Sequence, residues 1–176
     1  MKVGNPRTSG SWQGSGQRPE KGFYMKSILI IGLGRFGRHL CRKFMSLKNE
    51  VMIVDRDEAA VTALADEVTS AQIADCTDEN ALCALGVKNF DICFVCIGSD
   101  FASSLLITST LKEMGAARVV AKAARDVHAK LLLRNGADEV VYPERDSAER
   151  LATRLSAQNV FDYIELTDEY SIYEIA

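Results

Sequence analysis

The stretch SILIIGLGRFGRHL, residues 27–40, decides the fold because it predicts a strand, a glycine-rich turn and a helix in direct succession. Its apolar run ILIIG, residues 28–32, is typical of a strand that is covered on both faces of a sheet. In the segment that follows, apolar residues recur at the spacing of one helix face: Phe36, Leu40, Phe44 and Leu47. A strand, turn and helix of this kind indicate a unit that holds a nucleotide.

Gly32, Gly34 and Gly37 fit the pattern G-x-G-x-x-G, and each glycine has a mechanical reason. Gly32 permits the tight turn off the strand, Gly34 lets the backbone approach a pyrophosphate, and Gly37 lets the helix pack closely on the sheet. The amino end of the helix then offers unpaired N–H groups and a partial positive charge to the phosphates. The pattern alone is weak, but its place between a strand and a helix is the expected context.

The acidic partner of this turn is Asp55, which ends a second predicted strand at residues 50–55. A carboxylate there can accept hydrogen bonds from both ribose hydroxyls of an adenosine and would repel a 2′-phosphate, so NAD, ATP or ADP is favoured over NADP. The purely structural alternative is a glycine-rich packing turn, with Asp55 capping the helix that starts near Asp57.

Further polar residues are predicted around the same ligand. Arg35 can reach phosphate oxygens with two hydrogen bonds, although a solvated surface arginine is the alternative. Residues 75–77 follow the third strand, near the adenine edge, and residues 97–99 follow the fourth strand, beside the point where the strand order reverses. The predicted nucleotide-binding set is Gly32, Leu33, Gly34, Arg35, Phe36, Gly37, Asp55, Arg56, Asp75, Cys76, Thr77, Ile97, Gly98, Ser99 and Lys122.

Alternating apolar runs and helix-period segments predict an α/β fold: a Rossmann-like, doubly wound, six-stranded parallel sheet with the order 3-2-1-4-5-6. The predicted strands are residues 28–32, 50–55, 71–75, 90–98, 117–122 and 138–143. The predicted helices are residues 58–68, 78–85, 101–114 and 126–135, after the one that opens at the glycine turn. A last helix near residues 146–157 carries an apolar stripe: Ala148, Leu151, Ala152 and Leu155.

The chain of 176 residues divides by composition. Residues 1–24 hold five of the twelve glycines and are expected to be a disordered leader, either cloning-derived or a start-site extension. The binding domain is predicted at residues 26–145, and residues 146–176 form the last helix and the start of a truncated or absent further lobe. Beyond the leader, 17 basic and 23 acidic residues argue against nucleic acid. The chain has neither a signal peptide nor a run of roughly 20 apolar residues, so it is expected to be cytoplasmic.

Catalytic constellations are missing from the sequence. Cys93 and Cys96 form C-x-x-C, but three residues along a strand put them on opposite faces, so they are interpreted as core residues. The leading hypothesis is therefore a nucleotide sensor without turnover. The rival hypothesis is a fragment of an NAD-dependent oxidoreductase, which would need a substrate domain and an acid or base near the nicotinamide. A third hypothesis is a dimerisation module whose glycine turn is a relic.

Several segments together resemble an RCK/KTN (TrkA-N) domain, the regulatory N-terminal domain of bacterial potassium-uptake proteins of the Ktr and Trk type. They are IIGLGRFGRHL, VMIVDRD, IADCTDENAL, VCIGSD, LRNGADEVVYPERD and NVFDYIELTDEYSIYEI. The resemblance runs from about Lys26 to the end of the chain. It is specific because the GAD-x-V-x-x-PE-x-D segment and the Y-I-E-L tail accompany the glycine turn.

The resemblance implies homodimers that assemble into a ring, octameric by expectation, on the cytoplasmic face of a potassium-translocating membrane subunit. Exchange of ATP against ADP, or of NADH against NAD, would change the ring and gate transport. Arg35 resembles the family arginine that contacts the terminal phosphate of a neighbouring subunit's nucleotide. Glu144 matches an acid that binds a divalent cation in some members, and residues 148–155 match the crossover helix that docks a partner. Arg38 stands where a small residue is common.

Overall fold

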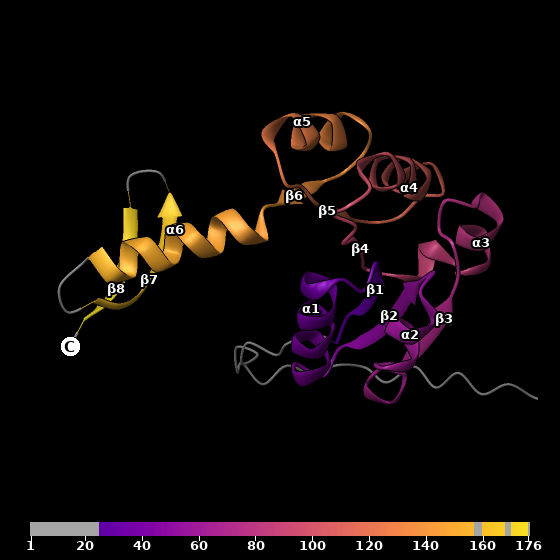
Figure 1. The fold of residues 1–176 in the computed structure, drawn as a ribbon, viewed down its shortest axis with the longest axis horizontal. Helices are drawn as coiled ribbons and strands as arrows, with labels where there is room; N and C mark the ends of the chain where they lie inside the picture. The colour runs from indigo at the N-terminus through magenta and orange to yellow at the C-terminus, as the bar shows by residue number, and fades with distance from the viewer. Residues whose placement is uncertain (1–24, 157–159, 168–169, 176) are drawn as a thin grey trace, which may run out of the picture.

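The computed structural model describes residues 25–156, 160–167 and 170–175, so the predicted leader at residues 1–24 lies outside the described residues. Strands and helices alternate over residues 27–141 (Figure 1). They are β1 (Ser27–Ile31), α1 (Arg35–Ser46), β2 (Glu50–Asp55), α2 (Glu58–Thr62), β3 (Ser70–Ile73), α3 (Glu79–Ala84), β4 (Ile92–Val95), α4 (Phe101–Glu113), β5 (Val119–Lys122), α5 (Asp126–Arg134) and β6 (Glu139–Val141). After them come α6 (Pro143–Ser156), β7 (Val160–Thr167) and β8 (Tyr170–Ile175).

The first six strands form one parallel sheet in the order β3-β2-β1-β4-β5-β6, which confirms the predicted fold. β1 lies in the middle, where Ile30 pairs with Ile53 of β2 on one side and with Phe94 of β4 on the other. Since all six strands run the same way, their carboxyl ends share one edge of the sheet. The strand order reverses between β1 and β4, and ligands of such sheets bind in the crevice at this point.

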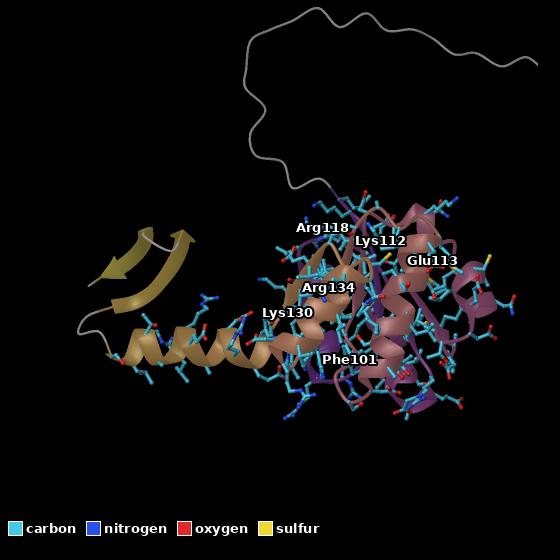
Figure 2. All side chains as sticks on the ribbon, turned by 90° about the horizontal axis from the view of Figure 1, so that it is seen from above. Phe101, Lys112, Glu113, Arg118, Lys130 and Arg134 are labelled. Carbon is cyan, nitrogen blue, oxygen red and sulfur yellow. The ribbon has the colours of Figure 1, made fainter. Side chains whose placement is uncertain are left out.

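Both faces of the sheet are covered, which explains the continuous apolar run in β1. Ile28 and Ile30 are fully buried in a core with α1 and α2, while Leu29 and Ile31 belong to a second core with α3, α4 and α5. In Figure 2, α4 and α5 lie side by side on this second face, and Phe101 lies at the opposite end of α4 from Lys112 and Glu113. None of the helices among the described residues combines the length and apolarity that crossing a membrane requires.

α1 crosses β1 at very close range, as the glycine pattern predicts. A Cβ on Gly37 would lie 2.1 Å from the carbonyl oxygen of Gly32, so no larger residue fits without moving the helix. Gly32 itself has a φ of +95°, which side-chain-bearing residues rarely adopt. These two glycines therefore fix where the amino end of α1 meets the carboxyl edge of the sheet.

Several predicted element boundaries are wrong, each for a local reason. The helix predicted at residues 58–68 ends at Thr62, and a single 3₁₀ turn follows at Ala65–Glu67, because the chain bends so that Leu64 enters the core with 1% of its surface exposed. β4 stops at Val95 rather than at residue 98, and β3 stops at Ile73 rather than at residue 75. The residues after each strand therefore belong to loops at the carboxyl edge of the sheet.

α6 begins at Pro143, three residues before the predicted start, because proline fits the first turn of a helix, where its missing N–H is not needed. The predicted domain boundary between residues 145 and 146 thus falls in the first turn of α6. This helix leads away from the sheet, and the antiparallel pair of β7 and β8 lies at its far end (Figure 1).

Candidate functional site

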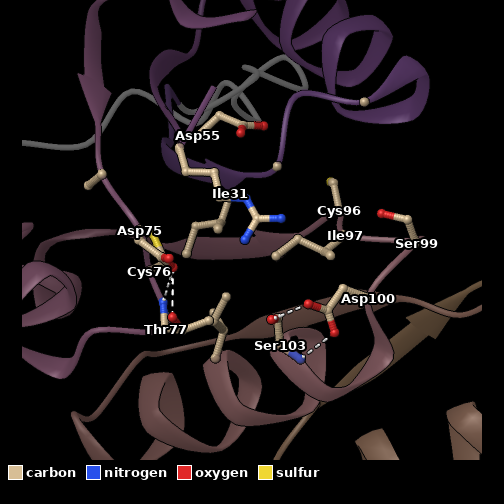
Figure 3. Close-up of a pocket in the computed structure, with 16 residues that line it drawn as sticks. Ile31, Asp55, Asp75, Cys76, Thr77, Cys96, Ile97, Ser99, Asp100 and Ser103 are labelled. Carbon is tan, nitrogen blue, oxygen red and sulfur yellow. Dashed lines mark hydrogen bonds between the residues drawn. The ribbon is translucent and has the colours of Figure 1, made fainter. Parts of the chain in front are cut away.

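A cleft of about 230 Å³ opens at the carboxyl edge of the sheet, where the strand order reverses (Figure 3). Its walls come from the loops after β1, β2, β3 and β4 and from the first turns of α4. Ten residues of the predicted set line it: Gly32, Gly34, Asp55, Arg56, Asp75, Cys76, Thr77, Ile97, Gly98 and Ser99. The fold thus brings together residues that are 67 positions apart in the sequence, at the place that the topology favours.

The amino end of α1 has no side-chain cap. Gly34 is the N-cap residue, no side chain accepts a hydrogen bond from the first-turn amides, and the first turn holds no acidic residue. By contrast, α2, α3 and α4 are capped by the carboxylates of Asp57, Asp78 and Asp100. The N–H groups and the dipole of α1 are therefore open to an anionic ligand.

Gly34 leaves room for such a ligand. A Cβ built on it would meet no atom within 4 Å, and its φ of −64° is one that any residue can adopt. The local fold therefore does not require glycine at this position, in contrast to Gly37. Gly34 lines the cleft, and in a turn of this kind the second glycine lets the backbone approach a pyrophosphate.

Asp55 ties the glycine turn to the end of β2. Its Oδ2 accepts a hydrogen bond from the N–H of Leu33 at 2.6 Å, and its Oδ1 accepts one from the N–H of Asp57 at 3.0 Å. Asp57, not Asp55, caps α2, so the structural alternative named the wrong capping residue. A carboxylate offers about four acceptor positions, so two remain for donors of a ligand.

Two further carboxylates lie on the other side of the cleft (Figure 3). Asp75 accepts from the hydroxyl of Thr77 at 2.7 Å, and Asp100 accepts from the hydroxyl of Ser103 at 2.6 Å. These hydrogen bonds lower the pKa of each carboxyl group, and the positive charge of Arg56 lowers both further. Both groups are therefore ionised at neutral pH and can accept hydrogen bonds from hydroxyl or amino groups of a ligand.

The cysteines of the cleft are inert thiols. Burial raises the pKa of Cys76 to about 12 and that of Cys96 to about 12, so neither is a thiolate at neutral pH. Cys93 and Cys96 lie in different cores, on opposite faces of the sheet, which confirms their interpretation as core residues. Neither C-x-x-C cysteine is placed for metal binding or disulfide chemistry with the other.

Five residues of the predicted set do not line the cleft. Leu33 is buried in the core with α1, Phe36 packs against the same core, and Gly37 lies on the face of α1 that packs on Gly32. Arg35 is exposed in the first turn of α1, and Lys122 does not line the cleft but lies next to the lining residue Gly98. Arg38 occupies the small-residue position and donates from its Nε to the carbonyl oxygen of Leu33 at 2.7 Å, so it braces the turn.

Glu144, the predicted metal ligand, is paired with a lysine. Its Oε1 lies 2.7 Å from the Nζ of Lys122, and this hydrogen bond lowers the pKa of the Glu144 carboxyl group. Within residues 25–156, no three or more His, Cys, Asp and Glu side chains gather as a metal site would require. A role for Glu144 in binding a divalent cation stays a prediction.

The sequence reasoning missed six residues that line the cleft: Ile31, Ala74, Cys96, Asp100, Ser103 and Ile107. Asp100 could have been found, because an aspartate directly before an apolar helical run, with serine three residues later, is an N-cap signature. Ile107 could not, since it reaches the cleft from the second turn of α4 only through tertiary packing.

Comparison with known proteins agrees with this architecture. The family model of the TrkA-N domain matches residues 28–143. The chain is 44% identical to Ktr system potassium uptake protein C of Bacillus subtilis over 150 residues, which cover 85% of this chain and 68% of the relative. It is 42% identical to Ktr system potassium uptake protein A of the same organism, with the same coverage of both chains.

Two solved structures share the fold at lower identity. The GsuK channel bound to NAD has a TM-score of 0.67 at 21% identity and covers 83% of this chain and 26% of its own. The Kef C-terminal domain of Shewanella denitrificans in an AMP-bound form has a TM-score of 0.63 at 23% identity, with 75% and 82% covered. These structures share the fold, and the family match over residues 28–143 together with the two relatives above 40% identity establishes that the chain belongs to the TrkA-N domain family, as its sequence predicted.

Proposed function

We propose that this chain is a regulatory subunit of a Ktr-type potassium uptake system, and that it binds ATP/ADP or NAD/NADH in the cleft. Two relatives above 40% identity are named as Ktr potassium uptake proteins. Neighbours of the same fold are described as bound to NAD, ADP or AMP. The function therefore fits both the relatives of the chain and the usual ligands of the fold.

The observation that carries the proposal is the open space at Gly34, in front of the uncapped amino end of α1. Phosphates would rest against the α1 amides, the ribose against Asp55, and the base near Asp75 and Thr77. The ionised carboxylates around the cleft accept hydrogen bonds, which suits the hydroxyl and amino groups of an adenosine. Their negative charge disfavours an additional phosphate on the ribose.

Sensing fits the cleft better than catalysis of a hydride transfer. The side chains that line it are apolar groups, hydroxyls, ionised carboxylates, one arginine and two thiols with raised pKa. None of them is a histidine, lysine or tyrosine that could exchange a proton with a carbonyl or hydroxyl substrate. The relatives are named as potassium uptake proteins, so the oxidoreductase alternative has no support from them.

The remaining expectations form part of the same proposal. The subunit acts as a homodimer or octameric ring on the cytoplasmic side of a membrane potassium-translocating partner. Nucleotide exchange changes the population of two ring states, which requires a ligand that binds one state more tightly than the other. A divalent cation bound through Glu144 would be an additional ligand of the assembled form.

Thermal unfolding with ATP, ADP, NAD and NADH tests the proposal, with Gly34→Ala as the matched variant. A nucleotide present at 100 times its dissociation constant adds about 2.7 kcal/mol to the stability of the wild type. The alanine variant keeps the melting temperature of the unliganded protein and loses this gain, because its methyl group occupies the phosphate space. An unchanged melting temperature with all four nucleotides, or an equal rise in melting temperature for the wild type and Gly34→Ala, would contradict the proposed site.

A further inference from the structure

Lys122 is a largely buried cation with spare hydrogen-bonding capacity. It ends β5 at the ligand-binding edge, and its side chain is 13% exposed. Among the described residues its ammonium group has one hydrogen-bond partner, the Glu144 carboxylate at 2.7 Å. Because an ammonium group carries three donors, two remain for another acceptor.

The same ammonium group lies directly behind the wall of the cleft. Its Nζ is 3.4 Å from the point where a Cβ on Gly98 would stand, and Gly98 lines the cleft. The charge of Lys122 also reaches the cleft residue Cys96, where it lowers the thiol pKa against the larger, raising effect of burial. With no side chain on Gly98 in between, a ligand anion in the cleft can approach Lys122.

On its other side, Lys122 holds the first turn of α6 through Glu144. Glu144 also feels the positive charge of Arg35 on α1, and Arg145 attaches the same turn to the body of the domain. Its guanidinium pairs with Asp126 of α5 at 3.0 Å and stacks over the Tyr142 ring at 3.6 Å. Lys122 therefore provides the described ion pair that joins the start of α6 to β5, next to the cleft.

We propose that Lys122 is a positioning residue that couples the cleft to α6. An anionic group of a cleft ligand and the Glu144 carboxylate compete for its ammonium group, so that ligand binding weakens the attachment of α6 to β5. The inference rests on the proposed function because it requires a phosphate-bearing ligand in the cleft. It goes further by naming the contact through which occupancy reaches the helix that leads away from the domain.

The physical argument is a shared charge. One cation between two anions interacts less strongly with each than it would with one, and the two anions repel each other. Coupling between binding events is reciprocal, so if the ligand loosens the Glu144 contact, that contact must weaken ligand binding by the same factor. Removal of the Glu144 charge should therefore tighten binding.

Calorimetric titration of the full chain with ADP and with NAD, in EDTA so that no divalent cation takes part, tests this reciprocity. Glu144→Gln should bind more tightly than the wild type, by about five-fold or more, the lower end of typical coupling. Lys122→Met should bind more weakly. Adding Glu144→Gln to Lys122→Met should then tighten binding less than it does in the wild-type background, because the competition for the Lys122 cation is gone and only direct repulsion between the two anions is relieved.

Glu139→Gln is the matched control. Like Glu144→Gln, it removes the carboxylate of an ion pair made by a cation at an end of β5. Here the pair is Glu139 with Arg118. This pair belongs to the amino ends of β5 and β6. Figure 2 places Arg118 at the opposite end of the domain from Phe101, the residue directly after the cleft residue Asp100. Glu139→Gln should bind the nucleotides with the affinity of the wild type. If it instead binds more tightly by the same factor as Glu144→Gln, the effect comes from the change in net charge alone, and the inference is overturned.

Hydrogen exchange of residues 143–149 gives an independent reading. ADP should speed exchange there in the wild type and leave Lys122→Met unchanged. Suppose that ADP binds to the wild type. Equal affinities of the wild type and Glu144→Gln, or unchanged hydrogen exchange at residues 143–149, would then overturn the coupling and leave the proposed function standing. Absence of ADP and NAD binding in the wild type overturns both.

Discussion

At the scale of single residues, the glycines of the turn after β1 have separable roles. Gly37 has a packing role, because a Cβ would collide with the Gly32 carbonyl oxygen, whereas Gly34 faces open space. The sequence pattern predicted all three glycines but could not say which of them the fold itself requires. That distinction depends on the distance between α1 and β1, which only the packed structure gives.

Replacing Gly37 with alanine should destabilise the protein in the absence of any ligand. The added methyl group forces α1 away from the sheet, and insertions of this kind cost about 1–3 kcal/mol. Urea unfolding of Gly37→Ala should show a lower midpoint than the wild type, while Gly34→Ala keeps the wild-type midpoint. An unchanged midpoint for Gly37→Ala would mean that the close approach of α1 is not needed.

Asp55 has one role that the structure shows and another that the sequence predicts. As a ribose acceptor it was expected, but its 2.6 Å hydrogen bond from the Leu33 N–H also holds the glycine turn. Asp55→Ala leaves this N–H without its acceptor, and we expect a loss of about 1–3 kcal/mol in unfolding free energy. Asp55→Asn retains an oxygen that can accept the bond and should lose less.

Urea unfolding of the two Asp55 variants without nucleotide separates the roles, because the ribose is absent from that experiment. Equal stability of Asp55→Ala and wild type would show that the bond to Leu33 contributes nothing. If Asp55→Asn retains stability but loses nucleotide binding, its charge matters to the ligand rather than to the turn.

At the scale of elements, the sequence predicted the six strands, their order and their alternation with helices. Buried parallel strands are continuous apolar runs, and these are visible without a structure. The ends were less predictable because packing decides them, as where the burial of Leu64 ends the regular helix of residues 58–62. The same limit applies to the cleft, where loop residues such as Asp75 were found and Ile107, on the body of α4, was not.

The cap of α4 predicts a pH dependence of stability. Hydrogen bonds from Ser103 hold the pKa of Asp100 below its usual value in the folded protein. A carboxyl group with a depressed folded pKa stabilises the fold above its unfolded pKa of about 3.9, and this contribution is lost as the pH falls through the folded pKa. The affected window therefore lies on the acid side of about pH 4.

Asp100→Asn keeps a side chain that can cap α4 but does not titrate. Its unfolding midpoint in urea, followed from pH 7 to pH 3, should fall less steeply than that of the wild type. Ser103→Ala weakens the hydrogen bond that lowers the pKa and should change the profile in the same direction. Parallel profiles for all three proteins would show that the cap does not contribute to acid sensitivity.

At the scale of the whole molecule, α6 and the β7–β8 pair extend away from the sheet (Figure 1). Two leucines on α6 are exposed, Leu151 by 48% and Leu155 by 73%. Exposed apolar side chains on a helix that leaves the domain are a candidate surface for binding another protein. A second copy of the chain is the expected occupant, in line with the homodimer implied by the family.

Leu155→Asp should therefore convert dimers to monomers without unfolding the domain. The new charge would have to be buried against the partner, which is costly, whereas in the monomer it remains in water. Light scattering coupled to size exclusion should give the monomer mass for Leu155→Asp and the dimer mass for the wild type at the same concentration. Leu47→Asp is the control, because Leu47 is also exposed, by 38%, but lies at the end of α1. A dimer that survives Leu155→Asp and dissociates with Leu47→Asp would move the interface from α6 to the α1 end of the sheet.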